Sequence, residues 1–200
     1  LDLFQGSEAR LPWKPAAPET GLFALRRRPQ VQSRSNLPPI TTEYAVTAAA
    51  SLARYFLMRN RAVGISSRGH TREFLQADRG ERQLNKILEA LAVVEAVGNL
   101  PFAHLIATDG VRLNRNDTVI AISADPSPDW AVALQQIQRR GVNSIAVVVD
   151  GSSFGAAHRY DQLLGGLEAS GIATYKVTRD TPLEQALGQP VSSGNLKVRR

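Results

Sequence analysis

The pattern of apolar and polar positions is clearest in residues 117–150, where two apolar runs flank one amphipathic stretch. The runs, residues 118–123 and 142–149, are nearly unbroken and rich in β-branched residues, which is typical of strands covered on both faces of a parallel sheet. Residues suited to a helix cap, a first helical position and a helix end frame the stretch between them: Ser127, Pro128 and Gly141. The segment therefore predicts a strand–helix–strand unit with parallel strands.

The same periodicities predict alternating strands and helices along most of the chain. Further strands are expected at residues 1–4, 62–66, 72–77 and 172–177. Helices are expected to begin near residues 41, 81 and 102, after residue 155, and near residue 182. The run at 72–77 is half polar, as suits an edge strand.

Two of these helices have well-defined apolar stripes, which we expect to be buried. In the first, Thr41 or Thr42 suits the cap and the stripe is Ala45, Ala48, Ala49, Leu52 and Phe56. In the second, residues 78–81 resemble a capping box and the stripe is Leu84, Ile87, Leu88, Leu91 and Val94.

These elements predict an α/β fold with a doubly wound, mostly parallel sheet of about six strands, one antiparallel edge strand and helices on both faces. We expect a single domain over residues 1–190, with a loose tail at 191–200. A proline-rich stretch at 7–39 contains six prolines and is expected to be an insertion at the edge of the sheet where ligands bind. Because the chain opens inside an apparent strand, we expect it to be part of a longer protein.

Composition excludes few functions. The chain has 200 residues, of which 43% are hydrophobic and 21% charged, a net charge of +6 and no cysteine, so disulfides and thiolate metal sites are excluded. Most basic residues are spread along helices. Arg26, Arg27 and Arg28 form one short cluster without interleaved aromatic residues, so a nucleic-acid site is not expected.

Candidate binding residues lie where the predicted strands end, because ligands of such sheets bind at the carboxyl ends of the strands. Asp2 and Asp125, with Ser7, Ser123 or Ser127, are oxygen donors for a hard cation, although a turn at Asp125 and solvation of Asp2 explain them as well. Gly151, Ser152 and Ser153 precede a predicted helix and suit either an anion or a tight turn. His70, His104 and His158 lie in different elements, and no hydrolase or nucleotide-binding motif occurs.

Several stretches together resemble one bacterial family. They are TTEYAVTAAASLARYFL (41–57), RAVGI (61–65), RGERQLNKILEALAVVEA (79–96), NDTVIAIS (116–123) with PDW (128–130), and RRGVNSIAVVVDGSSFG (139–155). They are similar to the C-terminal half of the domain of unknown function 58 family, which resembles a von Willebrand factor A domain. The resemblance implies a parent protein with transmembrane helices, located on the cytoplasmic side at the inner face of the membrane. It also implies a MoxR-type AAA+ ATPase as the protein partner.

The resemblance implies a cation site that this sequence has largely lost. The family pattern D-x-S-x-S is matched only by Asp2, the loop before Glu81 offers no Thr, and after the fourth strand only Asp125 remains. We therefore expect vestigial metal ligands and no cofactor. The leading hypothesis is a non-enzymatic protein-interaction module, and the alternative is a small-molecule or anion-binding domain. Candidate partner contacts in the insertion are Trp13, Phe23, Arg26, Arg27 and Arg28.

Overall fold

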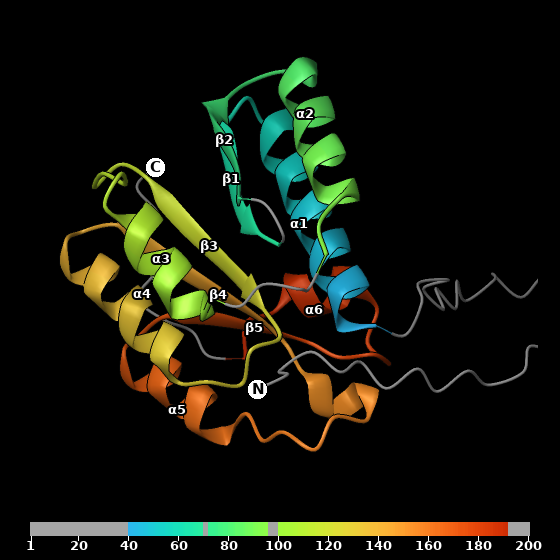
Figure 1. Ribbon diagram of the computed structural model, residues 1–200, viewed down its shortest axis with the longest axis vertical. Helices are drawn as coiled ribbons and strands as arrows, with labels where there is room; N and C mark the ends of the chain where they lie inside the picture. The colour runs from blue at the N-terminus through green and yellow to red at the C-terminus, as the bar shows by residue number, and fades with distance from the viewer. Residues whose placement is uncertain (1–39, 70–71, 96–99, 192–200) are drawn as a thin grey trace, which may run out of the picture.

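The computed structural model describes residues 40–69, 72–95 and 100–191 (Figure 1). Their elements follow the order α1 (Thr41–Met58), β1 (Val63–Arg68), β2 (Arg72–Asp78), α2 (Glu81–Ala92), α3 (Phe102–Gly110), β3 (Thr118–Ser123), α4 (Asp129–Arg139), β4 (Asn143–Val149), η1 (Gly151–Phe154), α5 (Asp161–Ala169), β5 (Ala173–Val177) and α6 (Leu183–Gly188). This order confirms the sequence-based succession of helices and strands from residue 41 onward.

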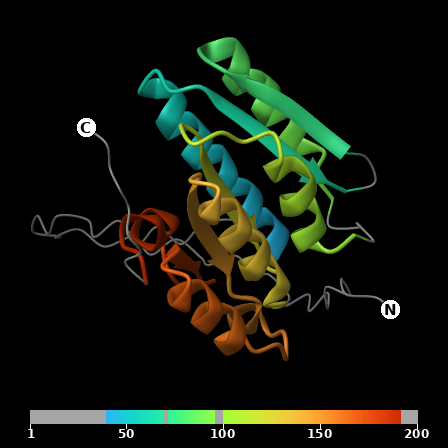
Figure 2. The same cartoon turned by 90° about the vertical axis from the view of Figure 1, so that its left-hand side faces the viewer.

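A parallel sheet of three strands, in the order β3-β4-β5, forms the larger half of the molecule. Its central strand, β4, is buried on both faces. Ala146 and Val148 face a core built with α3, α4 and α5, whereas Val147 and Val149 face a core built with α1 and α6. Figure 2 shows α3, α4 and α5 in front of the strands. The expected cover on both faces is therefore confirmed for this sheet.

The smaller half is an antiparallel hairpin of β1 and β2, on which α1 and α2 pack. Gln83, at the start of α2, is 3% exposed, and its side-chain amide donates to the carbonyl oxygens of Val63 (2.8 Å) and Gln76 (2.9 Å). A buried amide is stabilising only when its polar atoms have partners, so these bonds fix the helix to both strands of the hairpin.

The described residues do not form the single sheet of about six strands that the sequence predicted. They form two separate sheets, β1-β2 and β3-β4-β5. The predicted strand at 1–4 and the insertion at 7–39 lie outside the described residues. Of the predicted tail only Val191 is described, and its amide donates to the carbonyl oxygen of Thr174 (2.7 Å).

The stripe predicted for α1 is rotated in the structure. The buried side chains are Tyr44, Ala48, Ala53 and Leu57, whereas Ala45, Ala49, Leu52 and Phe56 are half-buried. The reason is that α1 packs on α2 as well as on the sheets, which draws Ala53 and Leu57 toward Ile87 and Leu91. Because this pairing is not local, the periodicity of α1 alone did not contain it.

Helix ends give a mixed outcome. Neither α1 nor α2 has a side-chain cap, since Ile40 and Gly80 occupy the capping positions, and Leu88 is 42% exposed rather than buried. At the start of α4, Pro128 and not the predicted Ser127 occupies the capping position, whereas the end of this helix is as predicted. The Ser127 hydroxyl accepts a hydrogen bond from the Asp129 amide (3.2 Å), and Gly141 has the positive φ of 92° that favours glycine after a helix.

Among the residues that the structure describes, no helix combines the length and the apolar character needed to cross a membrane.

Close packing of α3 on α4 gives the first prediction. A Cβ added at Gly110 would lie 2.3 Å from Cδ1 of Ile137, which is 3% exposed. Gly110→Ala should therefore lower the free energy of unfolding by about 1–3 kcal/mol, measured by urea denaturation. Ile137→Val removes Cδ1, so Gly110→Ala should lower the free energy of unfolding less in the Ile137→Val background than in the parent.

The matched control is Gly165→Ala in α5, where an added Cβ meets nothing within 4 Å. Because alanine restricts the unfolded chain and favours helix, this change should stabilise the fold by about 0.5–1 kcal/mol. Equal effects of the two alanine substitutions would contradict the packing described for Gly110.

Candidate functional site

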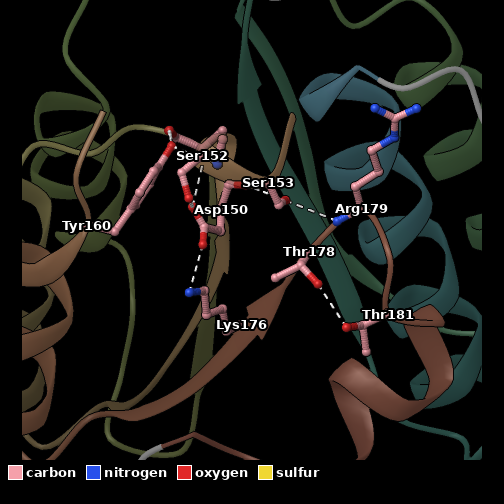
Figure 3. Close-up of polar contacts among 10 residues, drawn as sticks. Asp150, Ser152, Ser153, Tyr160, Lys176, Thr178, Arg179 and Thr181 are labelled. Atoms are coloured by element: carbon pink, nitrogen blue, oxygen red, sulfur yellow. Dashed lines mark hydrogen bonds and ion pairs between the residues drawn. The ribbon is translucent and has the colours of Figure 1, made fainter. Parts of the chain in front are cut away.

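Three loops meet at the carboxyl ends of the parallel strands, which is where the sequence placed the candidate binding residues. They are the loop after β3, the short 3-10 helix η1 after β4, and the turn after β5 (Figure 3). Asp150, the residue that follows β4, lies at their centre and is 5% exposed. Its surroundings therefore decide what this edge of the sheet can do.

The Asp150 carboxylate is fully engaged by neighbouring donors. One oxygen lies 2.7 Å from the ammonium of Lys176 on β5, and the other accepts hydrogen bonds from the amide (3.0 Å) and the hydroxyl (2.5 Å) of Ser152. Burial raises the pKa of the Asp150 carboxyl, but the hydrogen bonds from Lys176 and Ser152 and the charge of Lys176 outweigh burial and leave that pKa below its usual value. Asp150 is therefore ionised at neutral pH.

A second chain of hydrogen bonds joins η1 to the turn after β5. The Ser153 hydroxyl donates to the Asp150 carbonyl oxygen (2.7 Å) and accepts from the Arg179 amide (3.1 Å). The Tyr44 hydroxyl in turn donates to the carbonyl oxygen of Arg179 (3.1 Å), and the Tyr44 ring packs edge-on against Phe154 at 4.8 Å. The first turn of α1 is thereby attached to this edge of the sheet.

Tyr160 connects η1 to the loop after β3. Its hydroxyl accepts from the Gly151 amide (3.0 Å) and donates to the Ala124 carbonyl oxygen (2.6 Å). Burial raises the pKa of Tyr160; the Gly151 amide opposes this, and the charges of Asp150 and Asp125 add to it. A Cβ at Gly151 would lie 2.7 Å from the Tyr160 hydroxyl oxygen, so this position requires glycine.

The candidate cation ligands after β3 form a turn. The Asp125 carboxylate accepts from the Ser127 amide (2.9 Å), and the Ser123 hydroxyl accepts from the Asp125 amide (3.0 Å). The Asp125 carbonyl oxygen accepts from the Trp130 indole (3.0 Å). Both serines and the carboxylate therefore have local partners, as in the turn interpretation made from the sequence.

The structure brings some predicted residues together and leaves others undescribed. Ser152 and Ser153 bond to Asp150, and Gly151 bonds to Tyr160, on which the charge of Asp125 also acts. Asp2 and the predicted insertion contacts are outside the described residues: Trp13, Phe23, Arg26, Arg27 and Arg28. Within residues 40–69, 72–95 and 100–191, no three acidic or histidine side chains are grouped as metal ligands.

The alternative of an anion site at η1 meets two obstacles. The amides of Gly151, Ser152 and Ser153 already donate to the Tyr160 hydroxyl, the Asp150 carboxylate and the Asp150 carbonyl oxygen. The ionised Asp150 carboxylate would also repel an anion at this position. Neither amides nor charge at η1 favour an anion.

Sequence reasoning did not identify Lys176, Arg179 or Tyr160 as residues of this site. A signal existed for Lys176, because a lysine within the apolar strand β5 needs a partner when it is drawn inward. No local signal identified Asp150 as that partner, since the two are brought together by the pairing of β4 with β5.

The ion pair at this edge gives the second prediction. Lys176→Met leaves the buried Asp150 carboxylate without its cation and should lower the free energy of unfolding at pH 7 by about 2 kcal/mol, a value reduced because the Lys176 side chain is 33% exposed. The depressed pKa of Asp150 stabilises the parent above the unfolded pKa of about 4, and this stabilisation is lost as pH falls through the folded pKa. The difference between parent and Lys176→Met should therefore shrink between pH 7 and pH 3.

Urea denaturation at several pH values measures this difference. Lys86→Met, at an exposed position of α2, is the matched control and should change stability little. The double variant Asp150→Asn with Lys176→Met lacks the unpaired charge, so it should recover part of the free energy of unfolding that Lys176→Met loses. A deficit of Lys176→Met that is independent of pH would show that the charge of Asp150 is not its cause.

Comparisons of the chain with known protein families, with curated protein sequences and with solved structures find no match. What the loops do must follow from their own geometry.

Proposed function

We propose that this chain is a non-enzymatic protein–protein interaction module that binds its partner through the loops at the carboxyl ends of β3, β4 and β5, together with the insertion at 7–39. One observation carries the proposal. The polar groups of Asp150, Ser153 and Tyr160 are used to join the three loops to one another. Loops fixed in this way lose little conformational entropy on binding, which favours association.

The side chains that project from these fixed loops are polar and charged. Exposed residues at this edge include Ser152, His158, Arg159, Arg179 and Asp180. Charges at the rim of an interface steer association and select partners. We propose a MoxR-type AAA+ ATPase as the partner, and a membrane-associated, cytoplasmic parent protein, because the sequence resembles the domain of unknown function 58 family.

The proposal includes the finer fold, a von Willebrand factor A-like sheet of about six strands. Support comes from α1, whose side chains pack on both sheets. Leu52 packs against the same buried cluster as Ile120 and Ile122 of β3, whereas Ala49 packs against the same buried cluster as Val63 and Ile65 of β1. In the proposed fold a further strand lies between β1 and β3 and joins the two sheets, with residues 1–4 as its occupant.

Burial supports a missing neighbour at this place. On β3, Val119, Ile120 and Ile122 are only half-buried, whereas residues 146–149 on β4 are buried throughout. β3 pairs with β4 alone and β1 with β2 alone, so each has an edge without a strand partner among the described residues. Unpaired strand edges favour the addition of a strand.

Hydrogen exchange tests the added strand and gives the third prediction. In the intact chain, mass spectrometry should find slow exchange in peptides covering β1 and β3, because the added strand accepts hydrogen bonds from their outer amides. Leu3→Pro removes one amide and disfavours pairing, so exchange in both strands should accelerate. Gln32→Pro, in the predicted insertion, should leave it unchanged. Equal exchange in all three proteins would contradict residues 1–4 as the occupant.

The fourth prediction tests the contact face. The double substitution Arg159→Glu with Arg179→Glu reverses two exposed charges at the carboxyl edge without removing a buried bond. It should raise the Kd for the MoxR-type ATPase encoded in the same genome at least ten-fold, measured by biolayer interferometry. Lys86→Glu on α2, also exposed, should leave the Kd unchanged.

Melting temperatures of the variants control for folding. Absence of binding by the unaltered chain would reject the ATPase as partner. Equal weakening by Lys86→Glu would reject the carboxyl edge as the contact face.

A further inference from the structure

We propose a second contact face at the opposite edge of the parallel sheet, which binds an acidic protein segment that carries an aromatic side chain. This cationic–aromatic face consists of Phe74 on β2 and of Arg72, Val111, Arg112 and Arg115. It goes beyond the proposed function, because it lies at the amino ends of β3 and β4, away from η1 and the Asp150 network.

An exposed aromatic ring forms the centre of the face. The Phe74 side chain is 41% exposed on the hairpin. The guanidinium carbon of Arg112 lies 4.6 Å from the centre of the ring, and that of Arg72 lies 5.6 Å away. Stacking on a ring uses the flat face of a guanidinium and leaves its N–H edges free to donate to a carboxylate.

The two arginines beside Phe74 have different roles. Arg72 forms an ion pair with Asp109 of α3, and Asp109 also accepts a hydrogen bond from the Ser66 hydroxyl on β1. The Asp109 side chain is 12% exposed, so it is largely covered by these contacts. Arg72 is thus neutralised, and with Asp109 it fastens the hairpin to α3. The positive charge available to a partner comes from Arg112.

Hydrogen bonds from Arg140 fix the backbone of the loop that carries Arg112. The Arg140 guanidinium donates to the carbonyl oxygens of Gly110 (2.9 Å), Val111 (3.2 Å) and Leu113 (3.4 Å). Arg115 packs its aliphatic stem close to Gly141, where an added Cβ would lie 3.0 Å from Arg115 Cγ. The loop therefore presents Arg112 and Arg115 from a defined backbone.

Charge and apolar surface together define the partner. Among the described residues no carboxylate pairs with the guanidinium of Arg112 or Arg115, and both side chains are exposed. Val111, between them and the end of α3, is 68% exposed. One unpaired cation stacked on a ring, with a second unpaired cation and an aliphatic side chain on the same loop, complements a short segment with two carboxylates and an aromatic residue.

The size of the face favours a protein segment over other anionic partners. A membrane surface attracts clusters of basic residues together with several inserted apolar side chains, and a nucleic acid requires a longer stripe of phosphate contacts. Here one ring, one valine and two unpaired guanidiniums lie around a single loop. These dimensions suit a few residues of extended peptide.

Fluorescence anisotropy tests the face with a labelled peptide of sequence Glu-Glu-Phe-Glu-Glu-Phe, and gives the fifth prediction. The unaltered chain should bind it at low salt, and binding should weaken as salt rises. Arg112→Glu and Phe74→Ser should each raise the Kd at least ten-fold. Arg54→Glu, at an exposed position of α1, is the matched control and should retain binding. A Lys-Lys-Phe-Lys-Lys-Phe peptide should not bind.

Competing occupants are tested with the same variants. Vesicles containing phosphatidylglycerol and a twelve-nucleotide single-stranded thymidine oligonucleotide should bind more weakly than the acidic peptide. Tighter binding of either, lost in Arg112→Glu, would overturn the choice of a protein segment. Absence of peptide binding, or equal binding by the chain and Arg112→Glu, would overturn the face itself. Because both substituted side chains are exposed, unchanged melting temperatures are expected, and Arg115→Glu replaces any variant that unfolds.

Discussion

The ion pair between Asp150 and Lys176 is the constraint on which the carboxyl edge of the sheet depends. A carboxylate that is 5% exposed remains charged there only because an ammonium and the two donors of Ser152 compensate for its lost hydration. The backbone carbonyl oxygen of Asp150 accepts a hydrogen bond from the Ser153 hydroxyl, which itself accepts from the Arg179 amide. The carbonyl oxygen of Arg179 in turn accepts from the Tyr44 hydroxyl. A continuous series of hydrogen bonds therefore connects Asp150 to the first turn of α1.

This arrangement is the basis of our proposal that the carboxyl edge binds a partner and performs no chemistry. A reactive carboxylate or tyrosine needs a pKa near the operating pH and an unoccupied approach. The pKa of Asp150 is lowered and that of Tyr160 is raised, so both groups are held away from the range in which protons are exchanged. The same hydrogen bonds join three loops that come from distant parts of the chain. A rigid rim results, and rigid rims suit recognition.

The sequence predicted local structure well and non-local contacts poorly. Apolar periodicity located the helices and strands from residue 41 onward, because each pattern lies within one element. The division of the strands into two sheets, the rotation of the α1 stripe and the exposure of Leu88 depend on which elements pack together. In the candidate site, Asp125 and residues 151–153 were identified because they follow strands. Lys176 was missed because its partner Asp150 lies far away in the chain.

The hairpin of β1 and β2 shows how much of the fold depends on side chains rather than on a continuous sheet. Backbone hydrogen bonds between described strands do not link it to β3. The hairpin is attached in two ways. The side chains of α1 pack on both sheets, and Asp109 of α3 binds Ser66 and Arg72 of the hairpin. This attachment also places Phe74 against the α3–β3 loop, so the cationic–aromatic face depends on the same junction.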